Sequence, residues 1–286
     1  MKVIELTGSF YEMGRQHARQ VQDLRPRLAE YMRRRLRGLE PLETELRPYI
    51  AELASAWEEI AWPTMGMLRG LAEGLDLKWE PFFRSTVASY LEGRVQRPAY
   101  AEGCTVWAAA NSVTRHGAPL LAKNRDIRSG HRSFQCLVRA RSFQGYRYLY
   151  VTSAGSPAVF SSGMNEAGLA VADTHVGSLD IGPGVAPYSA MMEILEHHNN
   201  VASALDYLRQ VPHMGDGTLV LTDRTGGMAV FEAGHSAHNI ILPEPDFVIS
   251  TNHFCGPQLH DSWTCLLYTS PSPRDFKYDL VCRLLL

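Results

Sequence analysis

The sequence has no long apolar run and little net charge, and each absence excludes a class of protein. None of its apolar runs reaches the roughly 18 residues that a membrane-spanning helix requires. The formal net charge is −2, so no overall field favours nucleic acid or an anionic membrane surface. We therefore expect neither nucleic acid nor a membrane among the partners.

Cysteines are few, and their arrangement excludes a disulfide framework or a zinc site. Their number is odd, and no two of them have the short spacing of metal-binding motifs. They are Cys104, Cys136, Cys255, Cys265 and Cys282. The adjacent His197 and His198 would point about 100° apart on a helix, and no third ligand follows at a useful spacing. We expect reduced thiols, no metal and no cofactor.

The N-terminus also lacks the pattern of a secretory signal. Acid and glycine occur within its first residues, and no continuous apolar core follows. Together with reduced thiols, this absence predicts a cytoplasmic protein. The 286 residues, 45% of them apolar, are enough for one large domain or two small ones with a buried core.

Two kinds of pattern meet at Cys104. Before it, apolar residues recur at helical spacing and predict helices over residues 9–37, 46–60, 63–75 and 81–91. After it, β-branched and aromatic runs predict strands, with two helices over 188–199 and 201–210. The predicted strands are 104–110, 118–124, 134–141, 146–153, 157–162, 168–172, 218–223, 228–233, 238–242 and 247–251. This order predicts an α+β fold of sheets covered by helices.

The end of the chain does not continue these patterns. Residues 264–286 have neither helical nor strand periodicity, and 267–275 resemble translated sequencing adapter. We expect native sequence to end near Trp263. The chain would then consist of a mostly helical segment (1–103), a core (104–263) and a non-native tail (264–286).

Arginines gather in the later part of the predicted first helix. They are Arg33, Arg34, Arg35 and Arg37. A solvated helix face is the simpler interpretation, and a phosphate clamp for a coenzyme A substrate is the sharper one.

Cys104 is the first candidate for chemistry. A free cysteine is most often a small buried hydrophobe, and on this residue alone that interpretation is favoured. A thiol that opens a strand after a glycine can instead attack the carbonyl group before it, because glycine permits the strained backbone that the attack needs. This attack would form a thioester, and hydrolysis of the thioester would make Cys104 a new N-terminus. Its α-amine, with an ordinary pKa of about 7.7–8.0, could then take the proton of the thiol.

Three polar residues downstream could serve such a nucleophile. Asp126 follows a strand that a predicted turn folds back alongside the strand of Cys104. Its carboxylate could therefore orient the α-amine, although an ordinary turn residue is the simpler interpretation. Asn252 ends a later apolar strand and could donate a side-chain N–H to an oxyanion. His253 could be a base, but a structural role is favoured.

Asn165 and His175 lie on either side of the predicted strand 168–172. Asn165 and Gly168 make a tight turn between apolar strands, and a hairpin explains them sufficiently. His175 lies at the end of the strand that follows.

Taken in order, these stretches resemble the acyl-coenzyme A:6-aminopenicillanic acid acyltransferase family. These are autoproteolytic N-terminal-nucleophile (Ntn) hydrolases related to conjugated bile acid hydrolases and penicillin V acylases. The matching motifs are Gly14 with His17, Glu102-Gly103-Cys104-Thr105, Asn124-Arg125-Asp126, Gly163-Met164-Asn165-Glu166-Ala167-Gly168-Leu169, Thr251-Asn252-His253 and Asp261-Ser262-Trp263. Each motif is weak alone, but their order and spacing are specific and extend over residues 1–263.

The resemblance implies an αββα four-layer sandwich and cleavage between Gly103 and Cys104 into an α-chain and a β-chain. It implies Cys104 as the nucleophile, Asp126 as the partner of its amine, and Asn252 as an oxyanion donor. Relatives continue beyond the region of Trp263 with a helix that carries a supporting arginine and with the final strands of a sheet. We expect these elements to be missing here.

Other residues could contact the substrate or support the site. They are Lys123, Arg125, Asn165, His175 and His253. Lys123 stands where the bile acid hydrolase branch has a substrate-facing arginine, and His175 stands near that branch's second oxyanion asparagine. Both departures argue against close kinship with that branch.

The sequence therefore predicts an enzyme that forms an acyl-enzyme from an acyl amide or thioester and passes the acyl group to water or an amine. Acyl-coenzyme A would be a substrate rather than a cofactor, and the expected protein partner is the chain's own cleaved α-chain. Two alternatives stay open. One is a papain-like hydrolase that uses Cys104 and His253 without self-cleavage, and the other is a non-enzymatic interaction protein with a helical binding module.

Overall fold

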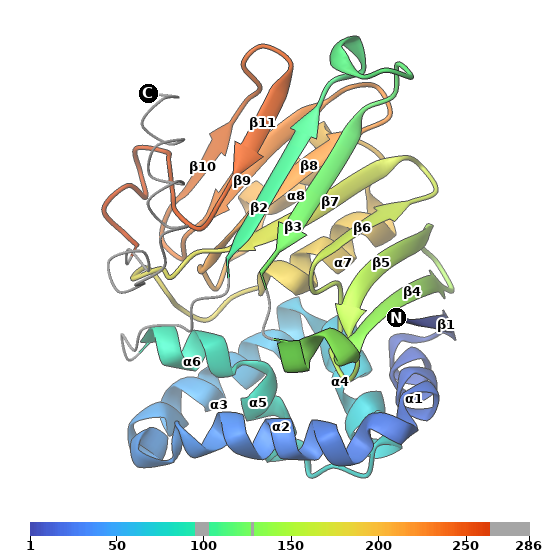
Figure 1. Cartoon of the computed structure of the whole chain (residues 1–286). Coiled ribbons are helices and arrows are strands. Elements are labelled where there is room, and N and C mark those ends of the chain that lie inside the picture. Colours follow the sequence, from blue (N-terminus) through green and yellow to red (C-terminus); the bar gives the residue numbers. More distant parts are fainter. Residues whose placement is uncertain (95–102, 127–128, 264–286) are drawn as a thin grey trace.

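The computed structural model describes residues 1–94, 103–126 and 129–263, which form helices and two β-sheets (Figure 1). The predicted tail and Glu102 lie outside these residues. The helices before Cys104 are α1 (Phe10–Gln20), α2 (Arg25–Arg37), α3 (Glu43–Ile60), α4 (Trp62–Gly74), α5 (Trp79–Thr86) and α6 (Ala88–Arg94). The later helices are α7 (Pro187–His197) and α8 (Val201–Gln210). The helical patterns therefore predicted helices in the regions where the structure has them, although not all of their boundaries.

Two predicted helices are each divided in the structure. The predicted helix 9–37 begins as expected, because the Ser9 hydroxyl accepts the Glu12 N–H while the Glu12 carboxylate accepts the Ser9 N–H. It ends at Val21, and Pro26 lies in the first turn of the next helix, α2. The predicted helix 81–91 is likewise divided at Val87, between α5 and α6.

The strands form one large sheet and one small sheet. The large sheet has the order β1-β4-β5-β6-β7-β8-β9-β10, and the small sheet has the order β11-β2-β3. The bounds are β1 (Lys2–Gly8), β2 (Cys104–Ala109), β3 (Leu120–Arg125), β4 (Gln135–Ser142), β5 (Arg147–Ser153), β6 (Ser162–Asn165), β7 (Leu169–His175), β8 (Gly217–Asp223), β9 (Met228–Ala233), β10 (His238–Ile241) and β11 (Phe247–Ser250). β1 pairs in parallel with β4, so the strand before the helices belongs to a sheet made mostly of later residues.

The predicted strand 157–162 is wrong. Residues 157–161 form a loop, and the strand β6 begins only at Ser162. Pro157 has no N–H to give to a ladder, while Ala158 and Val159 are buried in the core without being in a strand. Burial alone explains their apolar character.

The two sheets face each other. Helices α7 and α8 contact the large sheet on its opposite face, behind the strands in Figure 1, and α1–α6 gather at one end of the molecule. Apolar side chains fill the space between the sheets, namely Val106, Ala108, Ala172, Val220, Met228, Val230 and Val248. The α+β class is therefore confirmed. Within the described residues, no helix covers the outer face of the small sheet, where Trp107, Phe247 and Ile249 are exposed.

Helices α1 and α4 pack with their backbones in close contact. A Cβ on Gly14 would lie 2.2 Å from the Met67 carbonyl oxygen, and one on Gly70 would lie 2.1 Å from the Tyr11 carbonyl oxygen. Only glycine fits at these two positions. The physical role of Gly14 in its motif is thus helix packing.

One hydrophobic core spans both sides of Cys104. Buried side chains of β1 and of the early helices belong to the same cluster as those of β4, β5 and α7. Trp57 in α3 is an example, because its ring contacts Tyr188 in α7 and its indole N–H donates to the Gly184 carbonyl at 2.9 Å. The helical segment is therefore joined to the sheets by tightly packed contacts.

His17 gives this core a pH dependence. It is completely buried, burial lowers its pKa to about 4, and its Nε2 accepts the Gly155 N–H at 3.3 Å. Because the unfolded chain binds a proton at the ordinary pKa and the folded chain does not, stability should fall as the pH drops from about 6.5 towards 4, by up to about 3 kcal/mol. Urea unfolding across this range should show a shallower loss for His17→Gln, which keeps an acceptor but does not titrate. Equal pH slopes for the two proteins would contradict this assignment.

Candidate active site

Cys104 lies where the ends of three strands meet. It is the first residue of β2, the central strand of the small sheet, and pairs with Arg125 at the end of β3. β11 pairs antiparallel to β2 on the other side. Because both neighbours run antiparallel to β2, their last residues lie beside its first. Asp126 and Asn252, which follow β3 and β11, are therefore brought to Cys104.

Asn252 is bonded to two backbone groups of this site. Its Oδ1 accepts the Cys104 N–H at 2.8 Å, and its Nδ2 donates to the His175 carbonyl at 2.6 Å. An N–H requires an oxygen and a carbonyl requires a donor, so these partners fix which way the amide points. Asn252 thereby connects β2 with the end of β7.

Asp126 holds the other side of the same peptide bond. Its backbone N–H donates to the Gly103 carbonyl at 2.7 Å. Its Oδ2 would be 3.2 Å from a Cβ placed on Gly103, so the carboxylate lies over this glycine. The Asn124 side chain donates to Oδ1 at 3.3 Å. The Gly103–Cys104 peptide bond is thus held between Asp126 and Asn252.

The Cys104 thiol is buried beside charged groups of both signs. Burial raises its pKa, the Lys123 and Arg125 charges oppose that effect, and Asp173 adds to it. A hydrogen bond from the His175 backbone to the sulfur also lowers the pKa. The thiolate therefore depends on its neighbours for stabilisation.

The two nearby cations are engaged by protein groups. The Lys123 ammonium lies 2.5 Å from Asp173 Oδ1 and donates to the Ser161 carbonyl at 3.2 Å. Its side chain is only 6% exposed, which makes this a buried ion pair. The Arg125 guanidinium lies 4.9 Å from the centre of the Phe160 ring. Both residues lie near Cys104, and both cations already contact other protein groups.

His253 makes contacts outside the hydrogen bonds that connect Cys104, Asn252 and Asp126. Its Nδ1 lies 2.8 Å from the Thr251 hydroxyl, and its ring packs against Trp263 at 5.6 Å between centres. Burial lowers its pKa. These contacts tie the imidazole to the loop that follows β11.

Asn165 is placed away from Cys104. Its amide donates to the carbonyls of Leu195 and His198, at 3.0 and 2.7 Å, and its Oδ1 accepts the Leu169 N–H at 3.0 Å. It precedes β7, whereas His175 ends that strand, and seven strand residues span about 20 Å. The structure therefore brings together Cys104, Asp126, Asn252 and His175, with Lys123 and Arg125 beside them, but not Asn165.

Sequence reasoning missed a set of hydroxyl groups between the sheets. The Thr174 and Thr218 hydroxyls lie 2.6 Å apart, and Ser250 Oγ is 2.6 Å from Thr218. Thr174 also donates to the Thr251 carbonyl at 2.6 Å, which fixes the end of β11 just before Asn252. The available signal was the two-residue period of a strand, which places Thr174 on the same buried face as Ala172.

Asp173 and Asp216 were also missed. Asp173 pairs with Lys123, and Asp216 lies 3.3 Å from the imidazole of His175. Asp216 is flanked by Gly215 and Gly217 immediately before a buried strand, and that pattern was the available signal.

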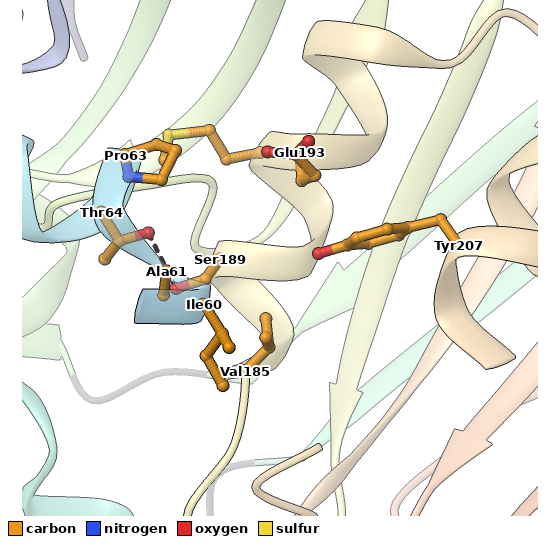
Figure 2. A pocket seen from close by; sticks show the side chains of 9 residues that line it. Ile60, Ala61, Pro63, Thr64, Val185, Ser189, Glu193 and Tyr207 are labelled. Atoms are coloured by element: carbon orange, nitrogen blue, oxygen red, sulfur yellow. Dashed lines mark hydrogen bonds between the residues drawn. The ribbon is translucent and has the colours of Figure 1, made fainter. Parts of the chain in front are cut away.

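Other features of the described residues bear less on the site. The pocket in Figure 2 has a volume of about 10 Å³, room for a single water, and it lies where Thr64 donates to Ser189 at 2.9 Å. The described part of the chain contains no group of three metal-ligating side chains. In that part, no helix is long and apolar enough to cross a membrane.

The arginines of α2 are partly paired on their own helix. Glu30 accepts from Arg33 at 2.8 Å and from Arg34 at 3.0 Å. These exposed pairs favour the interpretation of a solvated face.

The site and fold define an α+β protein with a buried cysteine at the start of a central strand. The sequence model of the acyl-coenzyme A:6-aminopenicillanic acid acyl-transferase family matches residues 113–274, more than half of the chain. The protein belongs to this family. The matched range contains Asp126, His175 and Asn252 but begins after Cys104.

Solved structures give weaker similarities. Two structures of altered forms of conjugated bile acid hydrolase from Clostridium perfringens match with 14% and 13% identity and TM-scores of 0.33. Each match covers 57% of this chain and 48% of the other. Penicillin V acylase from Agrobacterium tumefaciens matches with 18% identity and a TM-score of 0.30, over 49% of this chain and 41% of the other. The chain thus spans about half the length of these proteins or less. No curated protein is similar enough to match it.

Proposed function

We propose that this protein is a self-cleaving amidohydrolase or acyltransferase in which Cys104 becomes the N-terminal nucleophile. The observation that carries the proposal is the way the Gly103–Cys104 peptide bond is held. Its carbonyl oxygen accepts the Asp126 N–H at 2.7 Å, and its N–H donates to Asn252 at 2.8 Å. A peptide bond with both polar groups engaged next to a thiol is prepared for an intramolecular attack.

Self-cleavage would proceed through a thioester. The Cys104 sulfur attacks the Gly103 carbonyl carbon, and the negative charge develops on the oxygen that the Asp126 N–H already contacts. The C–N bond then breaks, and the proton from the thiol moves to the nitrogen, which becomes the α-amine. Water hydrolyses the thioester, releasing the carboxyl group of Gly103 and regenerating the thiol.

Turnover would use the same groups. The α-amine takes the proton of the thiol, and the sulfur attacks an acyl amide or thioester. Asn252 Nδ2 has two hydrogens, so one can stay on the His175 carbonyl while the other donates to the new oxyanion. The tetrahedral intermediate then collapses as the bond to the leaving amine or thiol breaks and the α-ammonium returns its proton to that group. The acyl-enzyme passes its acyl group to water or an amine. Acyl-coenzyme A would enter as a substrate.

The two proposed fragments would remain associated after cleavage. Residues on both sides of Cys104 share one buried core, and β1 is hydrogen-bonded along β4. Separating the fragments would expose this apolar surface to water, which is unfavourable. The α-chain is therefore the expected partner of the β-chain.

The papain-like alternative would require His253 as the base. The contacts of its imidazole with Thr251 and Trp263 do not support that role, and its lowered pKa makes it a weaker base than the α-amine. The geometry therefore supports the α-amine of Cys104 as the base.

Intact-mass spectrometry of the purified full chain tests the proposal. We expect two associated fragments, 1–103 and one beginning at Cys104, and labelling of free amines should modify the Cys104 nitrogen. Release of a chromogenic amine from acyl amides of different chain lengths would then be measured on the same sample. A single uncut chain with amidase activity would refute the self-cleaving mechanism and favour the papain-like alternative.

A further inference from the structure

We propose that Asp216 is a positioning residue for the Cys104 site, acting through the segment 175–178 that it holds in place. Because this role presupposes chemistry at Cys104, it rests on the proposed function. Asp216 immediately precedes β8 and is 3% exposed.

Asp216 contacts three neighbouring positions of this segment. Its carboxylate Oδ1 accepts the Ser178 N–H at 3.2 Å, and Oδ2 lies 3.3 Å from His175 Nδ1. Its backbone carbonyl accepts the Val176 N–H at 3.4 Å. A single buried residue therefore holds the backbone at the end of β7 by two hydrogen bonds and places a carboxylate oxygen beside the imidazole.

The segment in turn contacts the nucleophile. The His175 backbone bonds to the Cys104 sulfur, and its carbonyl accepts from Asn252 at 2.6 Å. Asn252 holds the Cys104 nitrogen at 2.8 Å. The contacts thus run without interruption from Asp216 through His175 to both reacting atoms of Cys104.

The backbone of Asp216 also suggests that its side chain is needed. Its φ is 75°, in the left-handed region where glycine is most at ease. A non-glycine residue in such a region is strained and often marks a functional site. Glycine would relieve this strain, but it would remove both carboxylate contacts.

The charges around Asp216 make its contribution pH-dependent. Burial raises its pKa to about 6, while the charge of His175 and the Ser178 N–H act in the opposite direction. Glu92 raises it further, and the Tyr90 phenol also faces the carboxylate. Below about pH 6 the carboxylate gains a proton, and its attraction for His175 and the Ser178 N–H weakens.

This protonation does not itself unfold the protein. The folded state binds the proton more tightly than the unfolded chain, whose aspartate has the ordinary pKa of 3.8. Titration of Asp216 therefore favours folding as the pH falls through about 6. As the pH falls through about 6, protonation of Asp216 should therefore loosen the Cys104 site while it favours the folded state.

Asp216→Asn separates these effects, because it keeps the shape and an oxygen for Ser178 but removes the charge. The probe is iodoacetamide, with the rate of Cys104 alkylation followed by peptide mass spectrometry between about pH 5 and 8. We expect alkylation about threefold to tenfold slower than in the wild type near neutral pH, since weakening the bond from His175 raises the thiol pKa. Below about pH 6 the alkylation rate of the wild type should fall more steeply than titration of the thiol alone would cause. In the variant this extra decline should be absent.

Asp180→Asn is the matched control. The Asp180 carboxylate accepts from the Ser236 hydroxyl and N–H, at 2.7 and 2.9 Å. We expect wild-type alkylation in this variant and a urea midpoint for Asp216→Asn at least equal to that of the wild type at neutral pH. Wild-type rates and pH dependence in Asp216→Asn would overturn the proposal, as would an equal slowing in Asp180→Asn.

Failure of the proposed function has a different signature. In that case the wild-type chain itself stays uncut and inactive, whereas the alkylation comparison still decides whether Asp216 acts on the Cys104 thiol.

Discussion

The variant Cys104→Ala should remain a single chain of full mass and show no acyl transfer. Cys104 supplies the sulfur for both proposed reactions, and the other described thiols are placed elsewhere, Cys136 in the core and Cys255 at the surface. Loss of a catalytic nucleophile typically lowers turnover by about 10⁴-fold to 10⁶-fold. Intact-mass spectrometry and amine release from an acyl amide would measure the two effects.

Cys255→Ala is the matched control for this experiment. It also removes one thiol, but the contact of Cys255 with Glu232 is made by its backbone N–H, which alanine keeps. We expect normal cleavage and turnover in this variant. A Cys104→Ala chain that is still cut before residue 104 would show that another group performs the attack.

Asn252→Ala should slow self-cleavage strongly while leaving most of the fold intact. The substitution removes the acceptor for the Cys104 N–H and the donor to the His175 carbonyl. Without the bond to its N–H the Gly103–Cys104 peptide bond is no longer held in place, and such a misplacement can cost about 10²-fold in rate. The fraction of cut chain, followed over time after refolding from urea, would measure this loss.

Asn165→Ala removes another asparagine, and we expect it to lower stability without slowing self-cleavage. Asn165 is 3% exposed and makes three hydrogen bonds that join β6, β7 and the end of α7. Its removal should lower the free energy of unfolding by about 2 kcal/mol or more, because buried backbone groups lose their partners. Molecules that remain folded should be cut at the normal rate. A normal rate in Asn252→Ala or a slow rate in folded Asn165→Ala would contradict these roles.

Periodicity was informative wherever an element has one clear buried face. It predicted α3, α4, α7 and α8 closely, since apolar spacing is a local signal, as are the first-turn prolines of α4 and α7. It failed at the loop 157–161, because burial of Ala158 and Val159 reflects packing rather than strand pairing. It also joined α1 to α2, because apolar spacing continues across the turn at Val21.

The candidate site was partly visible in the sequence, because its residues lie beside strands that the local pattern predicts. Cys104, Asp126 and Asn252 each adjoin a predicted strand end, where polar side chains form turns or take part in chemistry. Their shared location follows from the antiparallel order β11-β2-β3, which no local pattern specifies. Asn165 has the same local signal, yet its hydrogen bonds stabilise the end of α7.

The sequence by itself determined the α+β class, most helices and strands, and the cysteine at the junction of two patterns, because these depend on residues close together in the chain. Only the tertiary structure decided that Asp126 and Asn252 hold the two polar groups of the Gly103–Cys104 peptide bond. It also decided that Asp216, which immediately precedes β8, reaches His175 at the end of β7. These contacts join residues far apart in the chain, and they form only when β2, β7, β8 and β11 are packed against one another.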